Sequence, residues 1–215
     1  MYVPQVFRED RKDRLEELMR RSPLATVVTL GEDGWNANHI PLIYETAPDA
    51  PGTLHGHVAR ANPLWRDTRP DAEVLAIFQG EQAYVSPSWY ETKRQTGRAV
   101  PTWNYVAAHA YGTLETYTDA GRLRKHLTLL TAAHEAGFSQ PWTLDDAPPD
   151  FIAGLLNGIV GIDIHVTRLV GKWKVSQNRT PEDRAGAIGG LSSRHEPANT
   201  AMAELMRQFR PPDES

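Results

Sequence analysis

Short β-rich segments separated by turn residues constrain the fold of this chain more than any other feature of its sequence. Residues 24–30 (LATVVTL) are rich in β-branched side chains, residues 31–34 (GEDG) form a predicted turn, and residues 35–45 return as the second strand of a hairpin. Because the strands follow one another through hairpins and do not alternate with helices, we expect an antiparallel barrel, closed or partly open. Further strands are predicted at residues 53–58, 73–80, 82–86, 102–117 and 162–166, with a tight turn at Gly80-Glu81.

Helices are predicted between these strands and after them, so the expected fold class is mainly β with helices (α+β). Asn62-Pro63 combines an N-cap with a proline at the first helical position, and Thr180-Pro181 opens another helix in the same way. Thr118 is the predicted cap of a helix that ends near Glu135. The remaining helices are predicted at residues 10–21, 149–158 and 198–209, and residues 210–215 (RPPDES) are predicted to be a disordered tail.

Composition excludes several classes of function. The 215 residues include no cysteine, which excludes disulfides, thiolate metal sites and a cysteine nucleophile. The net charge is -4 and the basic residues are dispersed, so we expect no direct binding of nucleic acid by this chain alone. The N-terminal residues 1–14 are charged and contain no apolar run, so we expect no signal peptide, no membrane span and a cytoplasmic location.

Two tracts combine aromatic and basic side chains. Residues 84–105 read YVSPSWYETKRQTGRAVPTWNY, and residues 172–179 read KWKVSQNR. Rings beside serine, threonine, asparagine and arginine suit a flat, partly apolar ligand that carries an anionic group. The alternative is packing of these rings in the core or in a dimer contact, and the residues alone leave both interpretations open.

Other polar groups give weaker indications. His55 and His57 lie on one face of a strand, a spacing that suits either a metal or two hydrogen-bonded histidines, and the second interpretation is favoured, so no metal site is predicted. Arg60 follows the same strand and can donate two hydrogen bonds to a phosphate, or it can pair with a nearby acid. No serine has the signature of activation by a base, so catalytic residues stay unassigned.

The motifs taken together resemble a known family. In order along the chain they are MYVP, HIPL at residues 39–42, HVARANPLW at 57–65, YVSPSWYETK, VPTWNY, HAYG at 109–112 and KWKVSQNR. This combination resembles the PaiB-like family, described as FMN-binding negative transcriptional regulators, over residues 1–191. The resemblance implies a split β-barrel of the pyridoxamine-phosphate-oxidase-like kind that forms a homodimer with FMN at the subunit interface. Residues 192–215 would be an appended helix and tail.

The resemblance also implies which residues contact the flavin. The main chain of the second strand would read the ring, and a Ser-Arg-Lys phosphate motif matches Ala59-Arg60-Ala61 here, so only the arginine is retained. Polar side chains from the partner subunit and from the last strand would complete the site. The full predicted set is His39, Ile40, Pro41, His57, Val58, Ala59, Arg60, Thr102, Trp103, Asn104, Trp173, Lys174 and Gln177.

Three roles remain open at this point. The chain is a flavin-dependent oxidoreductase, a flavin-binding regulator of transcription, or a haem-binding split barrel with a histidine as axial ligand. The absorption spectrum of the purified protein separates flavin from haem. The sequence does not decide whether the protein is an enzyme.

Overall fold

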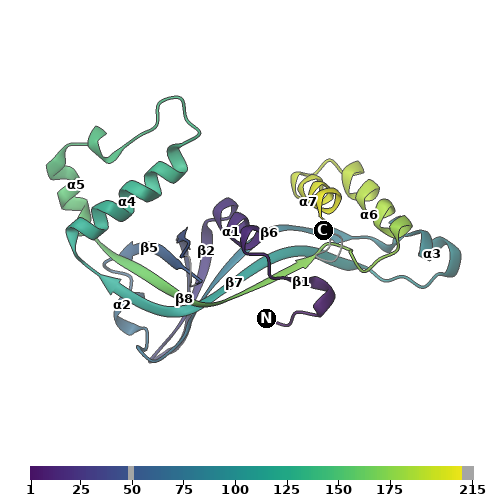
Figure 1. The fold of residues 1–215 in the computed structure, drawn as a ribbon, viewed down its shortest axis with the longest axis horizontal. Helices are drawn as coiled ribbons and strands as arrows, with labels where there is room; N and C mark the ends of the chain where they lie inside the picture. Colours follow the sequence, from purple (N-terminus) through teal and green to yellow (C-terminus); the bar gives the residue numbers. More distant parts are fainter. Residues whose placement is uncertain (48–50, 210–215) are drawn as a thin grey trace. The chain divides into compact units, whose positions relative to one another are not determined.

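The computed structural model describes residues 1–47 and 51–209 as strands, helices and connections (Figure 1). The predicted tail at residues 210–215 therefore lies outside the described residues. The strands are β1 (Arg8–Glu9), β2 (Leu24–Gly31), β3 (Gly34–Pro41), β4 (Ile43–Glu45), β5 (Thr53–Ala59), β6 (Val74–Val85), β7 (Thr102–Tyr117) and β8 (Ile159–Lys174). The α-helices are α1 (Lys12–Arg21), α2 (Leu64–Asp67), α3 (Glu91–Thr96), α4 (Ala120–Glu135), α5 (Pro149–Leu156), α6 (Pro181–Ser193) and α7 (Pro197–Gln208), with 3₁₀ turns η1 (Gln5–Phe7), η2 (Pro87–Trp89) and η3 (Leu144–Asp146).

The described strands form one antiparallel sheet, which confirms the predicted α+β class. Its order is β3-β2-β6-β7-β8-β5-β4, and β1 pairs with β8. The predicted hairpin at residues 24–45 is present, with Leu24 opposite Pro41 and Gly31 opposite Gly34. Among the described residues, no helix is both long and apolar enough to cross a bilayer.

The predicted turn at Gly80-Glu81 is wrong, because β6 runs unbroken through these residues. A side chain at Gly80 would place its Cβ 2.6 Å from a methyl of Leu18 and 2.6 Å from a methyl of Val106. The glycine is therefore needed for close packing against its neighbours and not for a change of chain direction.

Smaller corrections concern the ends of elements. The return strand of the first hairpin is interrupted at Leu42, which divides it into β3 and β4. Asp119, and not Thr118, caps α4, because its carboxylate accepts the Arg122 N–H at 2.8 Å. The amide oxygen of Asn62 accepts the Leu64 N–H at 2.9 Å, but the helix that follows is a single turn.

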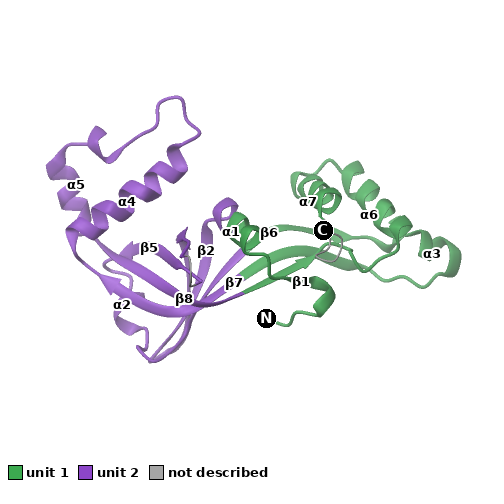
Figure 2. Ribbon diagram, viewed as in Figure 1, with its two compact units in different colours: residues 1–18, 79–108, 170–215 green, residues 19–78, 109–169 purple. Residues whose placement is uncertain are grey.

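The chain divides into two compact units (Figure 2). Unit 1 contains the described parts of residues 1–18, 79–108 and 170–215, and unit 2 contains those of residues 19–78 and 109–169. The strands β6, β7 and β8 each contribute residues to both units. The predicted domain boundary after Leu191 falls inside α6 and stays a prediction.

In unit 1, α6 packs directly onto η2. A Cβ at Gly186 would lie 2.0 Å from the carbonyl oxygen of Trp89, and one at Gly190 would lie 2.1 Å from its indole ring. Tyr90 is fully buried beneath this contact, with the Arg179 guanidinium 4.9 Å from its ring centre. Part of the aromatic tract at residues 84–105 is thus internal packing.

In unit 2, β5 and β8 separate an apolar face from a polar one. Leu54 and Ile164 are opposite each other and fully buried, whereas His55 lies opposite Asp163 on the other face. Above this polar face, α4 and α5 enclose a small apolar cluster of Leu123, Leu144, Ile152 and Leu156.

A pair of histidines joins α4 to β5. His57 Nδ1 and His126 Nε2 are 3.1 Å apart, and His126 is only 4% exposed. Its Nδ1 is buried without a hydrogen-bond partner among the described residues. We infer that His126 Nε2 carries the proton and donates to His57, because the unpaired nitrogen is then a lone pair and not a buried N–H. Burial, followed by the neighbouring His57 and His55, lowers the pKa of His126 to about 4.

Replacing Gly80 by alanine tests the packing of β6. We expect Gly80→Ala to lower the free energy of unfolding by about 1–3 kcal/mol, because the added methyl overpacks the contact with Leu18 and Val106. As a control, Gly189→Ala on the exposed side of α6 has open space around it and should raise stability by about 0.5–1 kcal/mol. Denaturant unfolding measures both variants, and a neutral Gly80→Ala would contradict the close packing.

The buried His126 should make the protein sensitive to acid. Its folded pKa of about 4 lies below the unfolded value of about 6.5, so the unfolded state binds the proton more tightly as the pH falls between these values. This histidine should therefore remove up to about 1.4 kcal/mol of stability per pH unit in that window. In His126→Gln, the free energy of unfolding should decrease less steeply with falling pH, by this amount per pH unit. Denaturant unfolding at pH 7, 6 and 5 measures the slope. His134→Gln, on an exposed part of the same helix, should keep the parent slope, and identical slopes in both variants would refute the assignment.

Candidate functional site

The structure divides the predicted flavin-site residues into two groups, one in each unit (Figure 2). It brings the members of each group together on neighbouring strands and their connections. The assignment of these residues to a flavin stays a prediction. The group in unit 2 is His39, Ile40, Pro41, His57, Val58, Ala59 and Arg60, and the group in unit 1 is Thr102, Trp103, Asn104, Trp173, Lys174 and Gln177.

In unit 2, β3 lies against the end of β5. A Cβ at Gly56 would be 3.3 Å from the Cγ2 of Ile40, and the Asn62 amide donates to the Asn38 side chain at 2.8 Å. Among the described strands, β3 pairs with β2 alone, so its other edge offers main-chain groups to a ligand. His39 and Pro41 are exposed there and Ile40 is buried.

Arg60 extends from the end of β5 to the connection between α5 and β8. Its Nε–H donates to the carbonyl of Asn157 at 2.6 Å and its Nη2 donates to the carbonyl of Ile159 at 3.3 Å. These bonds use two of the five N–H donors of the guanidinium, which is partly exposed. Arg60 therefore supports the local fold and still presents donors to solvent.

In unit 1, Lys174 links the start of β7 to the end of β8. Its ammonium donates to the Trp103 carbonyl at 2.6 Å and to the Thr102 hydroxyl. Burial lowers the pKa of this lysine, and the charges of Lys172 and Arg179 lower it further. Trp103 is 54% exposed and Tyr84 is 43% exposed. Their rings contact each other edge to face, with 6.2 Å between the ring centres.

Of the other three predicted residues of unit 1, two are buried and one is partly exposed. Asn104 is 1% exposed, and its amide nitrogen donates to the Ser176 hydroxyl at 2.9 Å. Trp173 is 3% exposed. The partly exposed Gln177 donates to the Val6 carbonyl at 3.0 Å and accepts the Val175 N–H at 2.8 Å. Asn104 and Trp173 therefore lie beneath the surface, and the side-chain amide of Gln177 is engaged by main chain.

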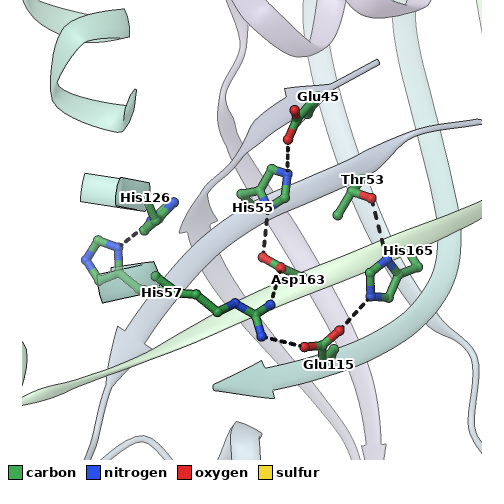
Figure 3. A network of polar contacts seen from close by, with 9 residues as sticks. Glu45, Thr53, His55, His57, Glu115, His126, Asp163 and His165 are labelled. Atoms are coloured by element: carbon green, nitrogen blue, oxygen red, sulfur yellow. Dashed lines mark hydrogen bonds and ion pairs between the residues drawn. The ribbon is translucent and has the colours of Figure 1, made fainter. Parts of the chain in front are cut away.

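Unit 2 also holds a chain of alternating charges (Figure 3). Asp163 is at its centre and accepts hydrogen bonds from His55 at 2.8 Å and from Arg122 at 3.0 Å. Glu45 is bound to the other nitrogen of His55 at 3.0 Å. On the far side, Glu115 accepts from Arg122 at 2.8 Å and is bound to His165 at 2.9 Å.

The pKa shifts in this network follow from its contacts. The hydrogen bond to Asp163 raises the pKa of His55, and the charges of Asp163 and Glu45 add to the effect. Burial pushes the pKa of Asp163 upward, but His55 and Arg122 outweigh burial and hold it below its usual value. Burial and the nearby Asp163 carboxylate raise the pKa of Tyr117 to about 12. The contacts of the network therefore favour the protonated form of His55, which lies between the carboxylates of Asp163 and Glu45.

A cavity of about 130 Å³ opens beside this network. A larger cleft of about 520 Å³ lies between the β2–β3 turn and α2, where Asp33, Trp35 and Arg66 line it. No predicted flavin-site residue lines either one. Within the described residues, no group of three or more acidic or histidine side chains is placed to hold a metal ion.

From the sequence we predicted hydrogen bonds for His55 and His57 but did not identify the residues that form them. The structure shows each bonded to a different side chain, Asp163 and His126, so the favoured interpretation of hydrogen-bonded strand histidines is confirmed. One signal was present: Asp163 stands between Ile162 and Ile164, which puts a carboxylate on the polar face of a strand. The strand opposite, 108 residues away in sequence, could not be known from this pattern.

Comparison with known proteins supports the predicted resemblance. Residues 1–168 match the family model described as "Putative FMN-binding domain". The chain is 34% identical over 206 residues to the protease synthase and sporulation protein PAI 2 of Bacillus subtilis (strain 168), covering 96% of each chain. It is also 32% identical over 244 residues to the uncharacterized protein AN0679 of Emericella nidulans, covering 97% of each.

Two solved structures share the fold at low sequence identity. One is the FAD and heme binding protein from Mycobacterium smegmatis, with a TM-score of 0.55 and 17% identity over 78% of this chain and 73% of that one. The other is the flavocytochrome Anf3 from Azotobacter vinelandii, with a TM-score of 0.56 and 12% identity over 86% of this chain and 78% of that one. The fold likeness agrees with the antiparallel architecture, and the sequence matches decide the family. The chain belongs to the family described as "Putative FMN-binding domain", as its resemblance to PaiB-like proteins predicted.

Proposed function

We propose that this protein is a homodimeric FMN-binding protein. In this proposal one subunit contributes β3, the end of β5 and Arg60, and the other contributes Trp103 with Lys174. The observation that carries the proposal is the family match, which covers residues 1–168 and so includes Arg60 and Trp103. When bound, FMN supplies the redox chemistry of its isoalloxazine ring, and the protein supplies binding and orientation.

The local chemistry is compatible with FMN. Arg60 is a partly exposed guanidinium whose position is fixed by two carbonyls, so little side-chain entropy is lost when it binds a phosphate. Trp103 offers an exposed ring of the kind that packs on a flat heterocycle. Lys174 provides a partly buried cation near that ring. Asn104 and Gln177 are engaged internally, which favours a supporting role for them.

The sequence analysis considered two flavin-dependent roles, oxidoreductase and regulator of transcription. Both require that the protein binds flavin, so FMN binding is tested first. The absorption spectrum of the protein purified with its native ligand tests the proposal directly. Flavin bands support it, whereas a Soret band without flavin bands would support the haem alternative.

Removing the Arg60 side chain should separate phosphate recognition from ring binding. A charge-assisted hydrogen bond contributes about 1.5–3 kcal/mol, so Arg60→Ala should weaken FMN by about tenfold to more than a hundredfold. Riboflavin lacks the phosphate and should bind almost unchanged. Arg60→Lys should recover only part of the FMN affinity, because lysine cannot form the bidentate contact. Fluorescence titration of both flavins measures these effects.

The nearby exposed Arg66 provides the control, because Arg66→Ala removes the same charge from α2. It should leave both affinities close to those of the parent. Equal losses of FMN and riboflavin in Arg60→Ala would mean that Arg60 only supports the connection between α5 and β8, and the phosphate assignment would fail.

A charge placed on the exposed aromatic surface should separate the subunits. Exposed rings beside basic residues are enriched at interface cores, so Trp103→Glu should shift the protein from dimer toward monomer and weaken FMN. Light scattering at micromolar concentration measures the mass. Trp142→Glu alters another exposed tryptophan, in unit 2, and should leave the dimer intact. A monomeric parent protein would refute this proposal.

A further inference from the structure

We propose that the cavity beside the charge network of unit 2 is a second ligand site, for a small monocarboxylate with a short apolar body. The cavity is distinct from the proposed FMN site, because no residue of the predicted flavin set lines it, although its wall residue His126 is hydrogen-bonded to His57. The cavity has a volume of about 130 Å³. Its walls come from β4, β5, β7, β8 and α4, through Ile43, Glu45, His55, Tyr117, Arg122, Lys125, His126, Leu129 and Asp163.

The structure already places one carboxylate on the imidazole of His55, which lines this cavity. The carboxylate of Glu45 binds Nε2 of His55 at 3.0 Å, and the side chain of Glu45 is 69% exposed at the edge strand β4. The other nitrogen of His55 is held by Asp163, whose side chain is only 9% exposed. Asp163 therefore holds the imidazole of His55 in place. The exposed carboxylate of Glu45 is the partner that a ligand carboxylate can replace.

Lys125 supplies a cation without an internal partner. It lines the cavity, and among the described residues its side chain forms no ion pair or hydrogen bond. The neighbouring Arg122 is occupied by Glu115 and Asp163 and lies 4.0 Å from the Tyr117 ring centre. On α4, the guanidinium of Arg122 is therefore already paired, whereas the ammonium of Lys125 is available to an anion.

The imidazole of His126 also lines the cavity. The side chain is more than nine-tenths buried, and its Nδ1 is itself buried and has no hydrogen-bond partner within the described chain. In Figure 3 this nitrogen is turned away from His57, to which the other ring nitrogen is bonded. Because Nε2 holds the proton in this pair, His126 adds a neutral ring to the wall and no donor for an anion.

Size and charge limit the ligand. A volume of about 130 Å³ holds about four water molecules at about 30 Å³ each, which excludes a nucleotide or a flavin. Ile43, Leu129 and the Tyr117 ring provide an apolar wall for a short hydrocarbon body. Asp163 and Glu45 repel a dianion, so a monocarboxylate is preferred to inorganic phosphate.

The test uses the full chain, with acetate and propionate as probes. Acetamide, propionamide and inorganic phosphate are the comparison ligands. Imidazole resonances in ¹⁵N NMR report on each histidine during a titration. We expect saturable binding of the two carboxylates, with shifts at His55 and His126 and none at His165, which does not line the cavity. The amides should not bind, and phosphate should bind at least several-fold more weakly.

Two substitutions one residue apart make the test specific. Lys125→Met should weaken propionate by about tenfold or more, since it removes a charge-assisted contact and keeps the aliphatic stem. Arg124→Met removes the same charge from the same helix, but Arg124 pairs with Asp145 and does not line the cavity, so affinity should stay within about twofold. Glu45→Gln should tighten binding, because the competing carboxylate is gone.

Each contrary result overturns the proposal. The absence of saturable binding to the parent protein would show that the cavity has no carboxylate site. Equal loss in Lys125→Met and Arg124→Met would show only general attraction of anions to the surface. Equal binding of propionate and propionamide would show an apolar pocket without charge recognition. All of these readouts are independent of flavin and so are separate from the failure of the FMN proposal.

Discussion

The polar half of unit 2 depends on the ion pairs that the buried carboxylate of Asp163 forms. This carboxylate ties β8 to β5 through His55 and to α4 through Arg122. A buried charge is tolerated only when it is paired and hydrogen-bonded, so removal of either partner would leave an uncompensated carboxylate inside the unit. The register that opposes Leu54 and Ile164 in the core also opposes His55 and Asp163 on the other face. Core packing and charge pairing therefore fix the same strand alignment.

The polar residues have different roles in the two units. In unit 2, side-chain contacts connect ionisable groups one after another from Glu45 to His165, and a cavity lies beside them. In unit 1, Asn104 and Gln177 are used to hold main chain and helices, and the exposed surface is formed by Trp103 and Tyr84. The first arrangement favours recognition of a small charged molecule, and the second favours a broad, flat contact.

Local sequence patterns predicted most of the strands and helices, because alternation and capping are short-range signals. The strand at residues 102–117 is observed with the same bounds, and the cap at Thr180 is observed as its hydroxyl accepting the Asp183 N–H. Gly80 was misjudged because its role depends on Leu18 and Val106, which are distant in sequence. The partners of His55 and His57 were missed for the same reason. The residues predicted for the flavin site came from family resemblance, because a site of the kind proposed, shared between subunits, would leave no periodic pattern in one chain.

The contact between α6 and η2 has a consequence for how this sequence can vary. The helix approaches so closely at Gly190 that the indole of Trp89 occupies the space of any side chain there, and at Gly186 the obstacle is the main chain itself. Among relatives that keep this helix position, 186 should therefore be invariant. Position 190 should covary with 89, and a larger residue at one should be accompanied by a smaller residue at the other.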